Sequence, residues 1–233
     1  MAYPFDRDTL LGRAIRPHVE RALYRSLKRS LRAVYLKGEL PKPPFVLAMN
    51  HHSFFDGHLV WFLFKVNGIR GSLLVSEENL RAFPVLRSAG ALDAHRLREA
   101  LRRLKSGEAV AVFPEGEMRP AGPLGPLKPG AAWLAKKAGV PILPVASRVW
   151  LRGFEHPEAF LLLGEPIPPD EETLEESLRG LLPTLDELYF FPPTPVRFFS
   201  GFRPILFSRR SLDERLKTLT EKMGQPSQTL ISV

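Results

Sequence analysis

Short apolar runs alternate with amphipathic segments along most of the chain. The apolar runs have strand length and cover residues 45–49, 72–76, 109–113, 140–149 and 160–164. Segments with apolar residues at helical spacing separate them, at residues 53–66, 77–83, 97–105, 131–138 and 170–188. Strands that alternate with helices are typical of a parallel sheet. The pattern therefore predicts an α/β fold with a mixed, mainly parallel sheet flanked by helices.

Residues 8–36 have the pattern of one long helix, or of two helices broken at Pro17. Apolar residues recur every four positions from Leu11 to Tyr35, and basic residues occupy the other faces. The basic residues are Arg13, Arg16, Arg21, Arg25, Lys28, Arg29 and Arg32. Such a helix fits an anionic membrane interface, and it equally fits a scaffold helix with a solvated basic face.

Internal prolines constrain two of the later segments. Pro141 and Pro144 lie in the strand run 140–149, which predicts an edge strand, a strand start or a bulge. Pro183 lies in the helical segment 170–188, where it predicts a kink or a split.

The C-terminal part mixes aromatic residues with prolines and arginines over residues 189–207. That mixture suits nucleic-acid stacking, an interfacial anchor or packing over the core. A short amphipathic helix is expected over 211–223. We predict an N-terminal basic amphipathic helical arm over 1–40, the α/β domain over 41–210, and a C-terminal helix and tail over 211–233.

Composition narrows the kinds of site and of binding partner that this chain can have. The chain has 233 residues, 44% of them hydrophobic, which suits one domain with a packed core. It has no cysteine, which excludes disulfides, thiolate metal sites and a cysteine nucleophile. A net charge of +8 and a pI of about 10 suit nucleic acid, an anionic membrane or an anionic substrate.

Membrane and targeting signals are weak. No run reaches the roughly 18–20 consecutive apolar residues of a spanning helix. The N-terminus carries Asp6, Arg7 and Asp8 and lacks the long apolar core of a signal peptide. We expect a cytoplasmic protein that lies on a membrane without crossing it.

The first apolar run carries the candidate chemistry. It ends abruptly in Asn50, His51, His52 and Ser53, and Asp56 follows two aromatic residues. His51 and Asp56 are five positions apart, about 140° on a helix, so they meet only if a turn reorients His51 before the next helix starts. Asp56 would then orient His51, whose other ring nitrogen would accept a hydroxyl proton. The alternative is a polar helix N-terminus capped by Ser53.

These residues resemble the first signature block of the glycerolipid acyltransferases, the 1-acylglycerol-3-phosphate acyltransferase family. Phe113-Pro114-Glu115-Gly116 resembles the third block, and residues 140–145 resemble the fourth. The segment Gly90–Arg96 resembles the second block, although His95 replaces the usual aspartate. The blocks follow the family's order, and the similarity covers roughly residues 45–170.

The resemblance implies an acyltransferase that acts at the cytoplasmic face of a membrane as a peripheral or monotopic protein. It would move a fatty acyl group from an acyl thioester, acyl-CoA or acyl-carrier protein, to the free hydroxyl of 1-acylglycerol-3-phosphate. His51 would be the general base and Asp56 its partner. The implied substrate-binding residues are Asn50, Ser53, Arg96, Glu115, Gly116 and Arg119. The usual arginine stands two residues after the glycine, whereas Arg119 stands three after Gly116.

The implied partners are a lysophospholipid acceptor, an acyl thioester donor and an anionic membrane contacted peripherally. We expect no nucleic acid, no cofactor beyond the co-substrate and no metal. Without cysteine, direct transfer is favoured over an acyl-enzyme on sulfur. Two alternatives stay open. One is the same chemistry on another lysophospholipid, a glycolipid or a carotenoid glycoside. The other is a non-catalytic basic module that binds membrane or nucleic acid.

Overall fold

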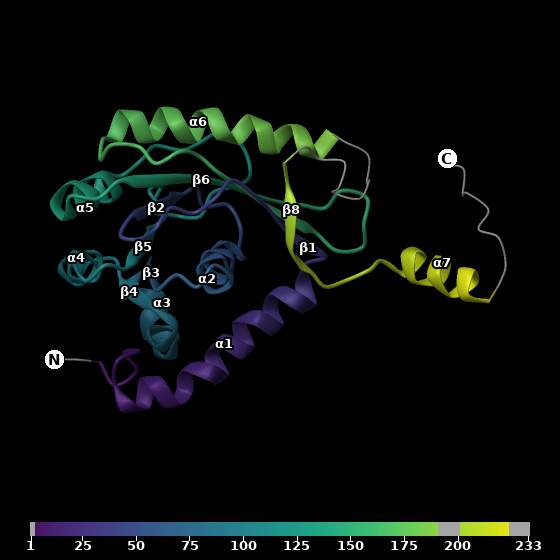
Figure 1. Cartoon of the computed structure of the whole chain (residues 1–233), viewed down its shortest axis with the longest axis horizontal. Coiled ribbons are helices and arrows are strands. Elements are labelled where there is room, and N and C mark those ends of the chain that lie inside the picture. Colours follow the sequence, from purple (N-terminus) through teal and green to yellow (C-terminus); the bar gives the residue numbers. More distant parts are fainter. Residues whose placement is uncertain (1–2, 191–200, 224–233) are drawn as a thin grey trace.

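The chain folds into a twisted sheet between two layers of helices, with a C-terminal helix that stands apart (Figure 1). The computed structural model describes residues 3–190 and 201–223. The helices are α1 (Leu10–Ser30), α2 (Asp56–Val66), α3 (Glu77–Ala82), α4 (Leu97–Lys105), α5 (Gly130–Ala138), α6 (Glu171–Glu187) and α7 (Leu212–Lys222), with 3₁₀ turns η1 (Pro84–Ala89) and η2 (Leu188–Phe190). The strands are β1 (Ala33–Lys37), β2 (Val46–Met49), β3 (Gly71–Val75), β4 (Ala91–Asp93), β5 (Ala109–Val112), β6 (Ile142–Trp150), β7 (Glu158–Leu163) and β8 (Arg203–Phe207).

The strands form an eight-stranded sheet in the order β4-β3-β5-β2-β6-β7-β1-β8. The first five strands of that order are mutually parallel. Strand β7 is antiparallel to β6, β1 is parallel to β7, and β8 is antiparallel to β1. The predicted mixed, mainly parallel sheet is confirmed. The carboxyl ends of β2, β5 and β6 therefore share one edge, which is where α/β folds place ligands.

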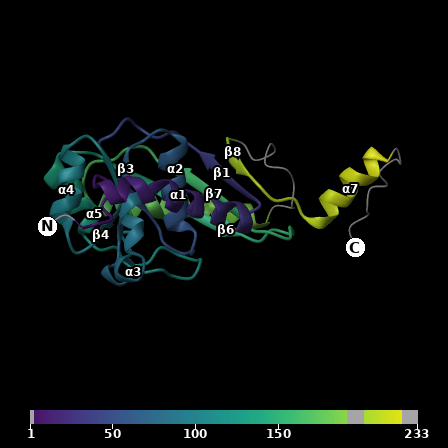
Figure 2. The same ribbon diagram turned by 90° about the horizontal axis from the view of Figure 1, so that it is seen from below.

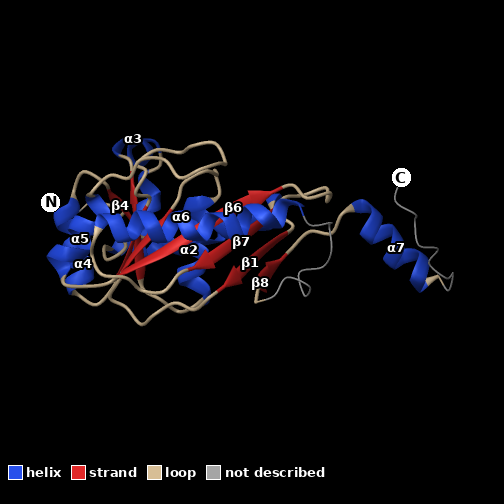
Figure 3. Cartoon of the chain, turned by 90° about the horizontal axis from the view of Figure 1, so that it is seen from above, coloured by secondary structure: helices blue, strands red, loops and turns tan. Residues whose placement is uncertain are grey.

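Helices cover both faces of the sheet and bury two apolar cores. Helices α4, α5 and α6 pack on one face, and Figure 3 shows α6 running across the strands. Helices α1 and α2 pack on the other face, and Figure 2 shows this side from below. Strands β2 and β5 are apolar and buried throughout, as expected for strands that helices cover on both sides.

The N-terminal helix is shorter than predicted. Helix α1 runs unbroken through Pro17 but ends at Ser30, so the expectation of helix up to residue 36 is wrong. The next residues form β1, which is buried between β7 and β8. Leu31 and Tyr35 fit the spacing of a helix. The backbone is extended here because it pairs with β7 and β8, which lie far along the chain and which the local pattern does not reveal. In the described part of the chain, no helix has both the length and the apolarity to cross a bilayer.

The two proline predictions meet different outcomes. Strand β6 lies inside the sheet, so the expected edge position of Pro144 is wrong. Pro144 has no N–H to donate, but the pairs between β6 and β7 begin only at Val145, and the Pro144 carbonyl accepts from the Gly164 N–H at 2.9 Å. Pro141 does lie just before the strand, and its carbonyl accepts from the Val46 N–H. Helix α6 continues through Pro183 without a split.

The C-terminal segment adds a strand and a helix to the fold. Strand β8 covers the outer edge of β1, and α7 begins with a capping box in which Ser211 and Glu214 bond each other's backbone. The helix expected over 211–223 is thus present. Most of the aromatic segment predicted over 189–207, including Phe191, lies in residues 191–200, outside the described residues.

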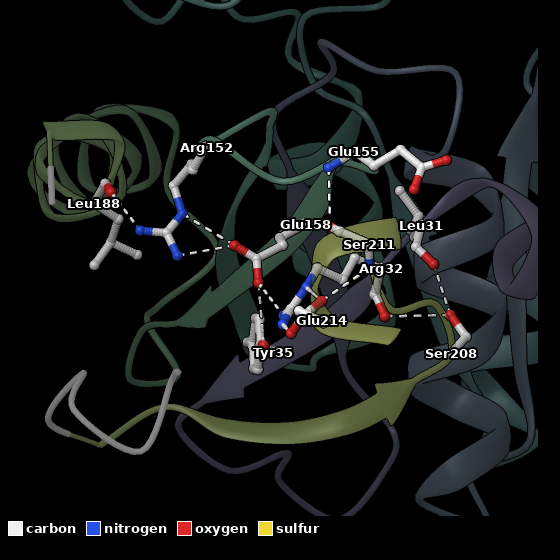
Figure 4. A network of polar contacts seen from close by, with 10 residues as sticks. All are labelled: Leu31, Arg32, Tyr35, Arg152, Glu155, Glu158, Leu188, Ser208, Ser211 and Glu214. Atoms are coloured by element: carbon white, nitrogen blue, oxygen red, sulfur yellow. Dashed lines mark hydrogen bonds and ion pairs between the residues drawn. The ribbon is translucent and has the colours of Figure 1, made fainter. Parts of the chain in front are cut away.

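A buried charge network ties these C-terminal elements to the sheet (Figure 4). The fully buried Glu158 carboxylate accepts from Arg32 at 3.0 Å, from Arg152 at 2.8 and 3.1 Å, and from the Tyr35 hydroxyl at 3.2 Å. Burial and the charge of Glu158 raise the pKa of Tyr35. Arg32 also pairs with Glu214 at 2.5 Å, so it is not part of the solvated basic face of α1.

We expect Glu158→Gln to lower the free energy of unfolding by about 3–5 kcal/mol, because it removes the buried countercharge that Arg32 and Arg152 share. The control is Glu175→Gln, which breaks the surface pair with Arg179 at 2.6 Å and should change stability by about 0.5 kcal/mol or less. Urea denaturation measures both variants. Equal losses in the two would show that the network does not stabilise the fold.

Candidate active site

His51 and Asp56 meet at the carboxyl end of β2. The Nδ1 atom of His51 lies 2.8 Å from Oδ2 of Asp56. If Nδ1 donates, the ring proton sits on that nitrogen and Nε2 keeps its lone pair. The imidazole is partly exposed whereas Asp56 is fully buried. The pair thus has the geometry of a base that a carboxylate orients, with the ring still reachable from outside.

The backbone between the two residues explains how they meet. Helix α2 begins only at Asp56, so the preceding residues are free to turn. The same Asp56 oxygen accepts the N–H groups of His52 and Ser53, each at 2.8 Å. The turn therefore wraps around the carboxylate, and the positive end of α2 adds to its stabilisation. Ser53 does not cap the helix; its hydroxyl accepts from the Phe55 N–H within the turn.

Glu115, from the loop after β5, holds the backbone of His51. Its carboxylate is buried and accepts the N–H of His51 at 2.8 Å and that of Gly125 at 2.9 Å. The carbonyl of His51 accepts from the Arg119 N–H at 2.9 Å, and the imidazole stacks on Phe113 at 4.2 Å. Both Glu115 oxygens are thus committed to backbone groups. This favours a positioning role over the head-group contact that the resemblance implies.

Asn50 joins the end of β2 to β6. Its amide donates to the Ser147 carbonyl at 3.3 Å and accepts from the Ser147 N–H at 2.7 Å. The Ser147 hydroxyl donates in turn to the second oxygen of Asp56 at 3.2 Å. Asn50 is buried in these bonds, so it shapes the site from behind. Sequence reasoning missed Ser147, although a polar residue within the apolar strand run was an available signal.

The loop after Glu115 depends on two glycines. Gly116 has φ +73°, and a Cβ there would lie 2.6 Å from the Lys128 amine. A Cβ on Gly125 would lie 2.5 Å from Nε of Arg119. The Arg119 side chain therefore lies over Gly125, and its guanidinium reaches Glu117 at 2.5 Å. Arg119 is partly exposed beside His51, so the structure brings this predicted residue to the site.

Arg96 lies away from this cluster. It follows β4, and strands β3 and β5 separate β4 from β2. Three strand spacings amount to roughly 14 Å. The contacts of Arg96 are to Asp93 at 3.5 Å and to the ring of Tyr3. The structure thus gathers Asn50, His51, Ser53, Asp56, Glu115, Gly116 and Arg119, and it leaves Arg96 outside the group.

The space beside His51 is small. A cavity of about 10 Å³, the size of one water molecule, lies among His51, His52, Glu115, Arg119 and Arg148. Burial lowers the pKa of the His52 imidazole. Burial likewise lowers the pKa of His58, on α2.

Arg148 is a second residue that sequence reasoning missed. It is almost fully buried, and it bonds Asp186 on α6 at 2.5 Å and the Gly122 carbonyl at 2.6 Å. Together these bonds connect β6, α6 and the loop around Gly122. Arg148 thereby fixes part of the wall of the cavity beside His51.

Known proteins resemble this chain in sequence and in fold. The acyltransferase family model matches residues 31–148, just over half of the chain. A chloroplastic 1-acyl-sn-glycerol-3-phosphate acyltransferase of Brassica napus is 30% identical over 110 residues, 44% of this chain and about a third (32%) of that protein's length. The crystal structure of the 1-acyl-sn-glycerophosphate acyltransferase PlsC of Thermotoga maritima shares the fold, with a TM-score of 0.57 and 24% identity. That likeness covers 78% of this chain and 83% of the other.

Replacing Glu115 by glutamine tests its positioning role. Glutamine keeps one acceptor but turns an amide donor toward the second N–H, so we expect a loss of about 1–3 kcal/mol in unfolding free energy. Glu117→Gln, two residues along and exposed, is the matched control and should change stability by about 0.5 kcal/mol or less. If both variants were as stable as the parent in urea, the carboxylate would not be holding the two loops.

Proposed function

The chain belongs to the acyltransferase family, and on that premise we propose that it transfers a fatty acyl group from an acyl thioester to the free hydroxyl of 1-acylglycerol-3-phosphate, forming phosphatidic acid. The observation that carries the proposal is the 2.8 Å contact between His51 Nδ1 and the buried Asp56 carboxylate. When Nδ1 donates to that carboxylate, the lone pair of the ring lies on Nε2, the atom through which a general base would act.

The proposed reaction is a direct transfer. The acceptor hydroxyl gives its proton to His51 Nε2 while its oxygen attacks the thioester carbonyl carbon. The carbon–sulfur bond then breaks, and the imidazolium returns the proton to the departing thiolate. Asp56 stabilises the imidazolium during this step, as a carboxylate partner does in hydrolase triads. The absence of cysteine agrees with a route that forms no acyl-enzyme on sulfur.

The acceptor head group would lie against Arg119. This guanidinium lines the cavity beside His51, and a guanidinium forks onto phosphate oxygens. Its present partner is Glu117, so binding would exchange one anion for another. A second candidate function keeps the same chemistry but uses an acceptor without a phosphate, such as a glycolipid. It is favoured because Arg96, the expected phosphate ligand, lies far from His51.

The substrate also suggests where the enzyme works. A lysophospholipid resides in a bilayer, and the net charge of +8 favours an anionic membrane surface over a neutral one. We propose peripheral or monotopic contact at the cytoplasmic face, with acyl-CoA or acyl-carrier protein as donor. No cofactor, metal or nucleic acid enters the proposed reaction.

Removing the imidazole tests the proposed chemistry. With lysophosphatidate and a labelled acyl thioester, His51→Ala should lower kcat by about 10²–10⁴, the contribution of a positioned general base. His18→Ala, on the exposed face of α1, is the matched control and should keep the parental rate. Circular dichroism confirms that both variants are folded. A parent that turns over no lipid acceptor, or a fully active His51→Ala, would refute the proposal.

An acceptor panel tests the role of Arg119. Arg119→Gln should raise KM for lysophosphatidate by about 10–100-fold, since a hydrogen bond to a charged group is lost, and it should leave KM for an uncharged acceptor unchanged. Arg96→Gln provides the comparison and should have the smaller effect, because Arg96 lies outside the cluster. Equal losses on charged and uncharged acceptors would mean that Arg119 only shapes the loop.

A further inference from the structure

Helix α7 exposes a continuous apolar stripe. Leu212, Leu216, Leu219 and Met223 recur at intervals of four, three and four residues, so they lie on one side of the helix. Their side chains are 53–71% exposed, and no residue of α7 is buried. A stripe of this kind is costly to leave in water, so it indicates a surface that another apolar phase covers.

The helix stands away from the body of the protein while its first turn is held firmly. Figures 1 and 2 show α7 apart from the sheet and its covering helices in both views. At its base, Glu214 pairs with Arg32, and the Ser211 hydroxyl accepts from the Glu155 N–H at 3.1 Å (Figure 4). The buried network thus fixes where α7 leaves the domain, and the stripe extends beyond it.

The helix departs from the edge of the sheet that carries His51. Strand β8 is antiparallel to β1, which is antiparallel in direction to β6 and β2, so β8 ends at the same edge as they do. Exposed apolar side chains follow the strands there: Phe54 after β2, Met118 after β5 and Leu151 after β6. Phe207, at the end of β8, is also exposed. These exposed side chains form an apolar rim along this edge, and α7 leaves the domain from the same edge, four strand positions from β2.

The charge around the stripe favours an anionic bilayer as the surface that covers it. Residues 203–223 hold six basic and three acidic residues, and one of the acidic residues, Glu214, is already neutralised by Arg32. Arg215 and Lys222 flank the stripe on one side, where an interfacial helix presents cations to lipid phosphates.

A second copy of the chain fits the stripe less well. Four aromatic side chains on each copy would bury about 1,200–2,000 Å² in total, whereas these leucines and the methionine are smaller and already partly covered. Stable interfaces bury about 1,200–2,000 Å² in total, so paired stripes would fall short of a lasting dimer.

We propose that α7 lies in the head-group region of an anionic bilayer, with its apolar stripe toward the acyl chains, and that it holds the rim of the active site against the lipid. The idea rests on the proposed function only in that the substrate is a membrane lipid. It assigns the membrane contact to the C-terminal helix, whereas the sequence pattern of α1 fitted a membrane interface and a scaffold helix equally.

Vesicle flotation of the full chain tests this assignment. Leu216→Ser with Leu219→Ser should weaken partition onto phosphatidylcholine–phosphatidylglycerol vesicles by about ten-fold or more, since two leucines lose their apolar surroundings. The matched control is Leu10→Ser with Leu11→Ser, the same exchange at two exposed positions of α1. It should change partition less than two-fold. A larger loss in the α1 variant, or no loss in the α7 variant, would overturn the proposal.

Two further measurements keep the test independent of folding and of catalysis. Because the chain has no cysteine, a single Leu219→Cys or Lys217→Cys accepts one environment-sensitive fluorophore. Anionic vesicles should shift the emission to the blue at position 219 and leave position 217 nearly unchanged; equal shifts would contradict the proposal.

Turnover of a short-chain acceptor dissolved as monomers should be normal in the α7 double variant. Failure of that turnover in the parent would count against the proposed function alone, since vesicle binding is measured without it.

Light scattering tests the remaining alternative, in which a second copy of the chain covers the stripe. The parent should be a monomer in the absence of vesicles. A dimer that dissociates in the α7 double variant, with vesicle binding unaffected, would assign the stripe to self-association and refute the membrane role.

Discussion

The buried negative charge of Asp56 is the constraint around which the site is built. Each of its oxygens accepts hydrogen bonds: one from the imidazole of His51 and two backbone N–H groups, the other from Ser147. A carboxylate removed from water is costly unless hydrogen-bond donors surround its oxygens. Its demand for donors bends the chain between β2 and α2 into a turn. The same turn delivers the catalytic candidate, His51, to the open edge of the sheet.

Two other buried carboxylates also collect hydrogen-bond donors from separate segments and hold those segments together. Glu115 is buried and satisfied by backbone N–H groups, and it ties the loop after β5 to His51. Glu158 is buried between two guanidinium groups, and it ties β7 to β1 and, through Arg32, to α7. In each case the carboxylate joins segments that are distant in sequence. These residues therefore act through geometry, and their side chains have little capacity left for a substrate.

The edge of the sheet around His51 exposes several apolar side chains. A cavity of about 10 Å³ lies beside His51, and the loops of the same edge expose Phe54, Met118 and Leu151. The lipid contact that we propose would remove these side chains from water. The buried Arg148 lines this cavity and is held by Asp186, which is partly exposed.

The sequence by itself determined the alternation of elements and the α/β class, and it singled out His51 and Asp56 as a candidate pair. Strand runs such as β2 and β5 are apolar throughout, and the polar block that begins at Asn50 marks the end of a strand, so local pattern was sufficient for both. The spacing of His51 and Asp56 left their pairing open, because the two residues meet only if a turn precedes the helix, and the family resemblance favoured the pair. Only the tertiary structure decided that residues 33–37 are a strand, that Pro144 sits inside the sheet, and that Arg96 lies three strands from His51. It also decided that Ser147 and Arg148 belong to the site. These features depend on strand order and on partners more than 90 positions away, which no local periodicity encodes.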